Sequence, residues 1–394
     1  MKKVFKYLGI FIGLIIVAIL IFASTQIDFS NPKDLNAYLE KKFKKSNISG
    51  MAVTLIEDNN VSFFKGYGYA DIDTKCEITK DTIFQIASIS KTVTGTAVMQ
   101  LYERGKIDLD KDINSYLPVK VSNPNYPNSP ITPRMLLAHS STLLDNDDLY
   151  NSLYTIGSGG GDSPVSLEEF VSSYFVEGGK WYDKEKNFSN SVPGSYYEYS
   201  NCAYGLLGYL VETVSKQPFN EYCRDNIFVP LGMNDTGWFL SEIDTNRMAI
   251  PYEKEDGFKA LPFYGFATYP DGCLKTSSND YAKFIMAFIN KGEYNGNRIL
   301  NENTVNEMLR AQIPELSKSQ AITWSLDAPG DLLINTGNQI VPGHTGGDPG
   351  ILTVAFFLPD KKTGAICFIN TGLKVDFKIP NLIMIITRLL EECS

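Results

Sequence analysis

Ser88 and Lys91 lie three residues apart in the segment Ala87-Ser88-Ile89-Ser90-Lys91. If Ser88 opens a helix, Lys91 lies one turn further along the same face, so the hydroxyl and the amine can meet. A serine becomes a nucleophile when a neighbour takes its proton, and a lysine can take it once burial or a nearby cation lowers its pKa. The free N–H groups at the helix start could hold an oxyanion. The pair therefore predicts acyl transfer, although a serine that only caps a helix has the same spacing.

Two further motifs follow, Tyr199-Ser200-Asn201 and His344-Thr345-Gly346. In chain order the three motifs read S-x-x-K, Y-x-N and H-T-G. The sequence resembles the serine β-lactamase and penicillin-binding-protein superfamily. Within it, the closest resemblance is to the class C β-lactamase branch, which also contains D-Ala-D-Ala carboxypeptidases, D-aminopeptidases and esterases. The resemblance covers roughly residues 34–391 and includes three weaker segments, Arg134 to Ser141, Pro230 to Met233 and Gly343 to Gly350.

The resemblance implies roles for the first two motifs. Ser88 would be the acylated nucleophile. Its proton would go either to Lys91 or to Tyr199, the latter held as a phenolate by the nearby lysine ammonium. Asn201 would hydrogen-bond Lys91 and the acyl amide of the substrate. Taken alone, Tyr199 and Asn201 would be read as a packed aromatic residue and a helix cap.

The third motif and the residue after it would form the substrate side of the site. The resemblance implies that His344, Thr345, Gly346 and Gly347 contact the substrate there. The backbone N–H groups of Ser88 and Gly347 would form the oxyanion hole, which typically contributes about 3–4 kcal/mol for each donor. Because Gly346 has no Cβ, the edge of the strand could approach the substrate closely.

His344 departs from the pattern of the β-lactamases in this branch, which usually carry lysine at that position. Imidazole is mostly neutral at pH 7, so recognition of a substrate carboxylate should weaken. Family members with histidine at this site are often esterases, D-amino-acid amidases or D-aminopeptidases. We therefore expect inefficient β-lactam hydrolysis.

The sequence leaves several functions open. The first is a serine hydrolase that forms an acyl-enzyme on Ser88 and cleaves an ester or amide of a small molecule or peptide. The alternatives are a true β-lactamase or D-Ala-D-Ala carboxypeptidase, and a penicillin-recognising protein without turnover. A Ser-His-Asp esterase using His344 or His139 ranks last, because the G-x-S-x-G elbow is missing. We interpret His139, near the end of a short helix over 132–139, as a packed structural residue.

Composition narrows the class of protein. The chain has 394 residues and a net charge of −9, which argues against nucleic-acid binding. With only two histidines and no C-x-x-C pair among six cysteines, neither a zinc site nor another metal or organic cofactor is expected. Disulfides are possible in an exported domain, but the cysteine spacing specifies none. We expect a monomer.

The N-terminus predicts a membrane anchor. Lys2, Lys3 and Lys6 precede an uncharged, largely apolar stretch over 7–27, about the length of a membrane span of roughly 20 residues. We expect residues 1–27 to form a single transmembrane helix with the lysines in the cytoplasm and residues 28–394 as an extracytoplasmic hydrolase domain. Cleavage of the segment as a signal peptide, giving a secreted protein, is the alternative.

Strand-like runs stand at both ends of this domain and helical patterns in the middle. We predict an α+β, β-lactamase/transpeptidase-like fold. Its antiparallel sheet comes from about 34–75 and 320–394, and a mainly helical insert occupies about 76–319. The predicted strands are 51–56, 61–70, 321–326, 332–335, 352–358 and 364–369. The predicted helices are 35–45, 88–104, 132–139, 201–211, 280–290, 303–311 and 380–392.

Overall fold

The computed structural model describes residues 27–394 except 333, 338 and 373–377. Apart from Ile27, the predicted membrane anchor over 1–27 lies outside the described residues. Within the described part of the chain, no helix is both long enough and apolar enough to cross a membrane.

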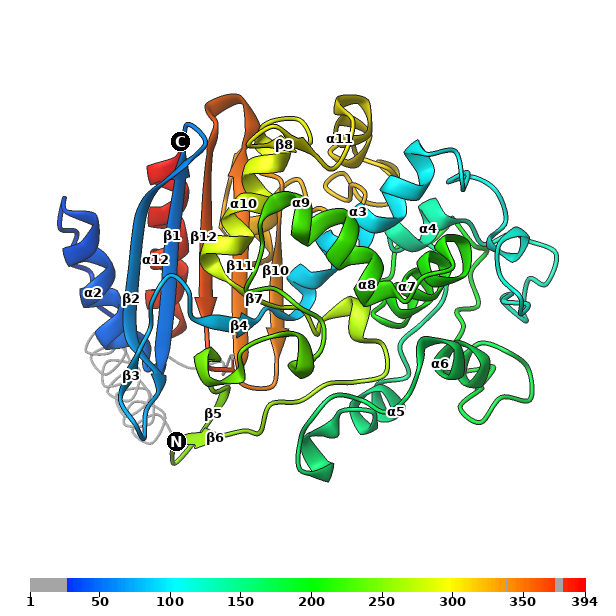
Figure 1. Cartoon of the computed structure of the whole chain (residues 1–394), viewed down its shortest axis with the longest axis horizontal. Coiled ribbons are helices and arrows are strands. Elements are labelled where there is room, and N and C mark those ends of the chain that lie inside the picture. The colour runs from blue at the N-terminus through cyan, green and yellow to red at the C-terminus, as the bar shows by residue number, and fades with distance from the viewer. Residues whose placement is uncertain (1–26, 333, 338, 373–377) are drawn as a thin grey trace, which may run out of the picture.

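A six-stranded sheet forms from the two ends of the chain, with strand order β10-β11-β12-β1-β2-β3 (Figure 1). Every neighbouring pair is antiparallel, and β1 pairs with β12 from Met51↔Ile369 to Glu57↔Thr363. The bounds are β1 Gly50–Glu57, β2 Asn60–Asp71, β3 Cys76–Glu77, β10 Gly343–Asp348, β11 Ile351–Leu358 and β12 Thr363–Ile369. The predicted α+β fold with a sheet from both chain ends is confirmed.

Helices cover both faces of this sheet (Figure 1). Alternate residues of β1 point to opposite faces, as a strand requires. Met51 and Val53 join one core with α2 (Leu35–Ser46) and α12 (Ile379–Cys393), whereas Ala52 and Ile56 join the larger core that contains α10 (Ser278–Ile289). The sheet is therefore buried on both sides, which explains the nearly continuous apolar runs in β1 and β11.

The segment between the two halves of the sheet is mainly helical. Its buried centre is α3 (Ser90–Glu103), which packs against α7 (Cys202–Ser215). The other helices are α4 Pro133–Leu137, α5 Asp147–Ser152, α6 Leu167–Tyr174, α8 Phe219–Cys223, α9 Val229–Leu231 and α11 Glu302–Met308. Three short strand pairs join them: β4 Ile83–Gln85 with β7 Lys275–Ser277, β5 Tyr252–Glu255 with β6 Gly257–Ala260, and β8 Glu293–Tyr294 with β9 Asn297–Arg298.

Two predictions of secondary structure are wrong. The segment 321–326 forms no extended strand, because Thr323 adopts a positive φ of 62° and its hydroxyl donates to the carbonyl oxygen of Lys91 at 2.6 Å. The apolar Trp324 in this segment packs against Phe357 of β11 instead of pairing in the sheet. At 332–335, Leu332 ends the 3₁₀ helix Ala328–Leu332, and Ile334 and Asn335 lie outside any strand.

All six cysteines lie in the described residues, and all are free. Five are buried, and Cys76 is exposed. The possibility of disulfides, which the sequence left open, is therefore not realised in this fold.

The packing of the sheet against the helical half gives a stability prediction. Phe357 is fully buried, with its ring centroid 5.3 Å from that of Trp324 and 6.2 Å from that of Phe288. We expect Phe357→Ala to lower the free energy of unfolding by about 3–5 kcal/mol, because it leaves a cavity between sheet and helices. Urea unfolding measures this. Ile340→Ala, at a residue that is 64% exposed, is the control, and equal losses in both variants would contradict this packing.

Candidate active site

Ser88 stands in a tight turn that is fixed before the helix begins. The turn Ala87–Ile89 is a 3₁₀ helix that leads directly into α3. Ser88 therefore precedes the α-helix, whereas the sequence had suggested that Ser88 opens it. Ala87 has a φ of 49°, a left-handed conformation that is unfavourable for a residue with a Cβ. The preceding Ile86 holds this turn in place, because its N–H donates to Leu274 and its carbonyl oxygen accepts from the hydroxyl of Thr353.

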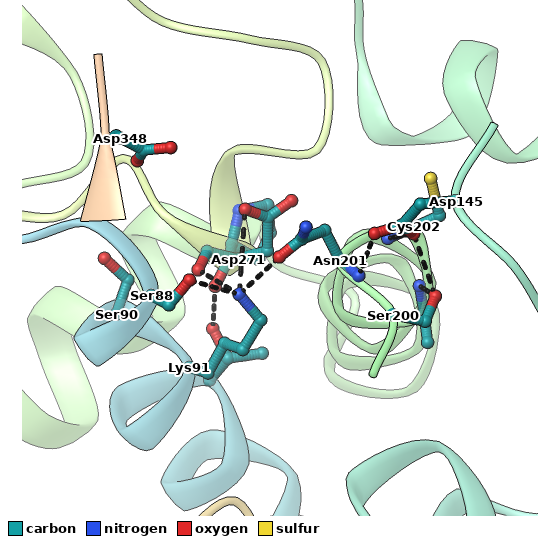
Figure 2. Close-up of polar contacts among 12 residues, drawn as sticks. Ser88, Ser90, Lys91, Asp145, Ser200, Asn201, Cys202, Asp271 and Asp348 are labelled. Atoms are coloured by element: carbon teal, nitrogen blue, oxygen red, sulfur yellow. Dashed lines mark hydrogen bonds and ion pairs between the residues drawn. The ribbon is translucent and has the colours of Figure 1, made fainter. Parts of the chain in front are cut away.

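The amine of Lys91 is fully buried and has three polar partners (Figure 2). Nζ lies 3.1 Å from Ser88 Oγ, 2.7 Å from Asn201 Oδ1 and 2.8 Å from the carbonyl oxygen of Asp271. The two carbonyl-type oxygens can only accept, so they fix two N–H groups of Lys91. The remaining position on Nζ faces Ser88 Oγ. If Lys91 is an ammonium, it donates a hydrogen bond to this oxygen; if Lys91 is a neutral amine, its lone pair can accept the serine proton. Burial lowers the pKa of Lys91, which favours the amine.

Two carboxyl groups influence Lys91, the buried Asp271 and the partly exposed Asp348. Asp271 Oδ1 is 3.9 Å from Lys91 Nζ and accepts a hydrogen bond from the Tyr150 hydroxyl at 3.1 Å. Asp348, at the end of β10, accepts one from the Tyr154 hydroxyl at 2.8 Å. Burial raises the pKa of Asp271 to about 8 and that of Asp348 to about 7, with Lys91 partly opposing both shifts. Each carboxyl group thus holds its proton more tightly than an ordinary aspartic acid.

Asp145 fixes the start of α7, from which Asn201 reaches Lys91. Its carboxylate accepts from the N–H groups of Asn201 and Cys202, each at 2.8 Å, and from the Ser200 hydroxyl at 3.0 Å (Figure 2). A carboxylate at a helix N-terminus satisfies free donors and interacts favourably with the helix dipole. Asp145 therefore sets the position of the Asn201 amide.

Tyr199 lies beside the same lysine and borders the solvent. Its ring centroid is 5.0 Å from Lys91 Nζ, and 37% of the residue is exposed. Burial of its hydroxyl raises the pKa of Tyr199 well above the ordinary value; a hydrogen bond with Ser88 opposes this shift, and nearby Asp271 and Asp145 add to it. The hydroxyl is therefore neutral in the resting protein. This disfavours the alternative in which Lys91 holds Tyr199 as a phenolate.

A groove of about 380 Å³ opens over Ser88. Besides Ser88, it is lined by His139, Tyr197, Tyr199, Ser319, Gln320, Thr323, Ser325, His344, Thr345, Gly346 and Gly347. The structure thus brings Ser88 and Tyr199 to the same groove as the whole third motif, with Lys91 and Asn201 hydrogen-bonded beneath them.

The third motif lies on β10, the strand at the end of the sheet. A Cβ on Gly346 would lie 2.8 Å from the carbonyl oxygen of Ile86, so only glycine lets β10 approach the turn that carries Ser88. At Gly347 a Cβ would meet nothing within 4 Å, which leaves this position open to the groove. Burial and the charge of Lys91 lower the pKa of His344 to about 4, so His344 is neutral near pH 7.

Four residues that contact the motifs, His139, Asp145, Asp271 and Asp348, were not predicted as site residues from the sequence. Asp145 lies in an irregular segment and Asp271 ends a three-residue 3₁₀ turn, and in neither place does a periodicity indicate which way a side chain points. Asp348 directly follows the predicted Gly347, so its place on the same strand was the one available signal. Within the described residues, no group of three or more His, Cys, Asp or Glu side chains could hold a metal ion.

Comparison with known proteins identifies the family of the chain. The model of the Beta-lactamase family matches residues 35–383, which is most of the sequence. The chain belongs to this family. Among curated relatives, "Protein flp" of Staphylococcus aureus (strain N315) is 26% identical over 272 residues, which is 68% of this chain and 50% of that protein. The chain thus spans about half the length of the relative it matches.

Two solved structures share the fold of this chain. The octameric penicillin-binding protein homologue from Pyrococcus abyssi has a TM-score of 0.73 and 26% identity, covering 89% of this chain and 76% of that one. The D-amino acid amidase from Ochrobactrum anthropi SV3, complexed with D-phenylalanine, has a TM-score of 0.71 over 91% of this chain and 98% of its own. At 21% identity, this second likeness shows the fold alone.

The buried carboxyl group of Asp271 predicts a pH-dependent stability. Its pKa of about 8 in the folded protein lies above the ordinary value of about 3.9 for an unfolded chain, so folding binds a proton between about pH 4 and about pH 8. This contribution to stability is complete below that window and is lost as the pH rises through it. Asp271→Asn keeps an acceptor for Tyr150 but does not titrate, so its stability relative to the unaltered protein should rise by up to about 1.4 kcal/mol per pH unit.

Urea unfolding at several pH values across this window measures the difference. Asp360→Asn, at an exposed residue after β11, controls for the loss of one negative charge. A constant difference between Asp271→Asn and the unaltered protein at every pH would contradict the proton uptake assigned to Asp271.

Proposed function

We propose that this chain is a serine hydrolase that cleaves an ester or amide through an acyl-enzyme on Ser88. The observation that carries the proposal is the 3.1 Å contact between Ser88 Oγ and the buried amine of Lys91 at the base of an open groove. The two other hydrogen bonds of that amine go to acceptors, so the remaining lone pair of a neutral Lys91 faces the serine hydroxyl.

In the acylation step, Lys91 is the base. Ser88 Oγ bonds to the acyl carbon while its proton moves to Lys91 Nζ, and the carbonyl electron pair moves onto the oxygen. The N–H groups of Ser88 and Gly347 hold this oxyanion, since both residues border the same groove. As the bond to the leaving group breaks, the neutral Tyr199 hydroxyl gives the leaving group its proton and recovers one from the Lys91 ammonium.

The deacylation step uses the same groups in the reverse order. A water molecule loses a proton toward Lys91 as its oxygen bonds to the acyl carbon, and the collapsing intermediate releases the acid. The proton returns to Ser88 Oγ, so that the site is restored. Asn201 holds Lys91 at 2.7 Å throughout and has its amide N–H₂ left for a substrate carbonyl.

The described part of the groove offers no positive charge near His344, which supports a substrate that has no carboxylate at that position. None of the described residues that line the groove is lysine or arginine, and His344 is neutral because its pKa is lowered to about 4. A true β-lactamase or D-Ala-D-Ala carboxypeptidase would need a cation in the groove to bind the carboxylate of its substrate. The described residues that line this groove supply none, which counts against both alternatives.

Several expectations from the sequence stay predictions. These are the membrane anchor over residues 1–27, the extracytoplasmic location of residues 28–394, the alternative of secretion after signal cleavage, and the monomeric state. A penicillin-recognising protein without turnover also stays an alternative, which the first experiment below separates from a hydrolase by the release of product.

We expect Ser88→Ala to abolish turnover of an activated short-chain ester and of a D-alanine amide, because the acyl group loses its point of attachment. Intact-protein mass spectrometry should find an acyl adduct on the unaltered protein and none on the variant. Ser90→Ala, two residues away on α3, is the matched control. Full activity in Ser88→Ala would refute the proposal, and a permanent adduct without product would favour the protein without turnover.

We expect His344→Lys to improve reaction with substrates that carry a carboxylate. A lysine ammonium at the groove wall supplies a charge-assisted hydrogen bond, so kcat/KM for a penicillin should rise by about tenfold or more while that for an uncharged ester falls or stays level. His344→Gln, which adds no charge, is the control. An equal change for the penicillin and the ester in both variants would show that charge at this position does not set specificity.

A further inference from the structure

The position of Tyr199 is set by a segment that forms neither a helix nor a strand. Residues 195–200, all of them described, lie in irregular backbone between the loop at 189–194 and the start of α7. In the proposed mechanism the Tyr199 hydroxyl must reach both Lys91 and the leaving group. The backbone on either side of Tyr199 therefore needs fixed partners, since a shift of about 1 Å in a catalytic group is costly.

His139 supplies partners on both sides of Tyr199. Its carbonyl oxygen accepts from the N–H of Glu198 at 2.9 Å, and its Nδ1 accepts from the N–H of Ser200 at 3.1 Å. Its ring stacks on the Tyr199 ring, with centroids 4.3 Å apart and planes 28° apart. One residue thus holds the Tyr197–Glu198 peptide, the Tyr199–Ser200 peptide and the Tyr199 ring itself.

This arrangement requires one protonation state of His139. Nδ1 can accept the Ser200 N–H only when it carries no proton, so the imidazole must be neutral with its hydrogen on Nε2. Burial and the nearby charge of Lys91 lower the pKa of His139 well below its ordinary value, which keeps the ring neutral.

The backbone of His139 is also unusual. After α4 ends, the N–H of His139 donates to Leu136 and that of Ser140 donates to Met135, which is the pattern of a Schellman helix end. The residue at this position takes a left-handed conformation, here with a φ of 55°, and is ordinarily glycine or asparagine. A histidine there costs backbone strain, and such strain at the edge of a catalytic groove points to a function.

We infer that His139 is a positioning residue for Tyr199, which it holds through its carbonyl oxygen, Nδ1 and stacked ring. The inference rests on the proposed function, because it assigns Tyr199 the proton for the leaving group. It also revises the interpretation of His139 as a packed structural residue. The ring packs, with Tyr204 on a further side at 5.2 Å between centroids, but its hydrogen bonds go to the segment that carries Tyr199.

The test compares two substrates of the same acyl group in Tyr199→Phe and His139→Gly. A p-nitrophenyl ester needs no proton on its leaving group, whereas an alkyl amide does. Both variants should lower kcat/KM for the amide by about tenfold more than for the ester. Glycine suits the left-handed backbone at residue 139, so His139→Gly leaves the helix end intact. His139→Asn, which keeps an acceptor and tolerates this φ, should recover part of the loss.

The amide also allows a double-mutant cycle, because the loss expected in His139→Gly is larger for this substrate. If His139 acts through Tyr199, His139→Gly should cost less than about twofold in the Tyr199→Phe background. Gln100→Leu, which removes two buried hydrogen bonds from the far part of α3, is the control for lost stability and should affect ester and amide equally.

Three results would overturn the inference: equal losses for ester and amide in His139→Gly, the same loss with and without Tyr199, or no loss at all. Ser88→Ala, assayed alongside, separates this failure from failure of the proposed function. If turnover depends on Ser88 but not on the His139–Tyr199 pairing, the hydrolase stands and the positioning role falls.

Discussion

The amine of Lys91 is completely buried, and this constrains the rest of the site. A buried amine without partners would cost several kcal/mol, on the order of 2–7, so the fold has to bring hydrogen-bond acceptors to it. The acceptors are Asn201 and Asp271, which lie 110 and 180 residues further along the chain. The packing of α3 against α7 and the placement of the 3₁₀ turn Tyr269–Asp271 follow from this need. With both acceptors in place, the one direction left to the amine is toward Ser88.

Charge around this amine is divided into two regions. Asp271 lies buried next to the amine and Asp348 lies partly exposed at the end of β10; each accepts a hydrogen bond from a tyrosine hydroxyl, and each has a raised pKa. On the groove side, His344 has a lowered pKa and carries no charge at neutral pH. A carboxylate in the groove would therefore find no opposing lysine or arginine among the described residues that line it. Burial of the Tyr199 hydroxyl raises its pKa, which keeps this group protonated as well.

The sequence predicted the parts of the fold and site that depend on local patterns. Apolar runs identified β1, β11 and β12, and amphipathic periodicity identified α2, α10 and α12. The Ser88–Lys91 spacing predicted one hydrogen bond of the site. Prediction failed where a contact distant in sequence decides the local structure. Residues 321–326 have the composition of a strand, but Thr323 instead turns to bind the carbonyl oxygen of Lys91, and Trp324 fills the core beside Phe357. Asp145 lies in an irregular segment and Asp271 in a three-residue 3₁₀ turn, and a single sequence does not indicate the direction of a side chain in either.

The irregular segments are nevertheless where the chemistry is placed, and the regular ones supply rigid supports on either side. Asp145 fixes Asn201 through the first N–H groups of α7, and His139 fixes Tyr199 through the end of α4. Each support uses the end of a helix, where free backbone groups need partners in any case. The groups that must move protons are thereby held by contacts that the fold already requires. This explains how side chains from loops can meet Ser88 and Lys91 without an extended secondary structure of their own.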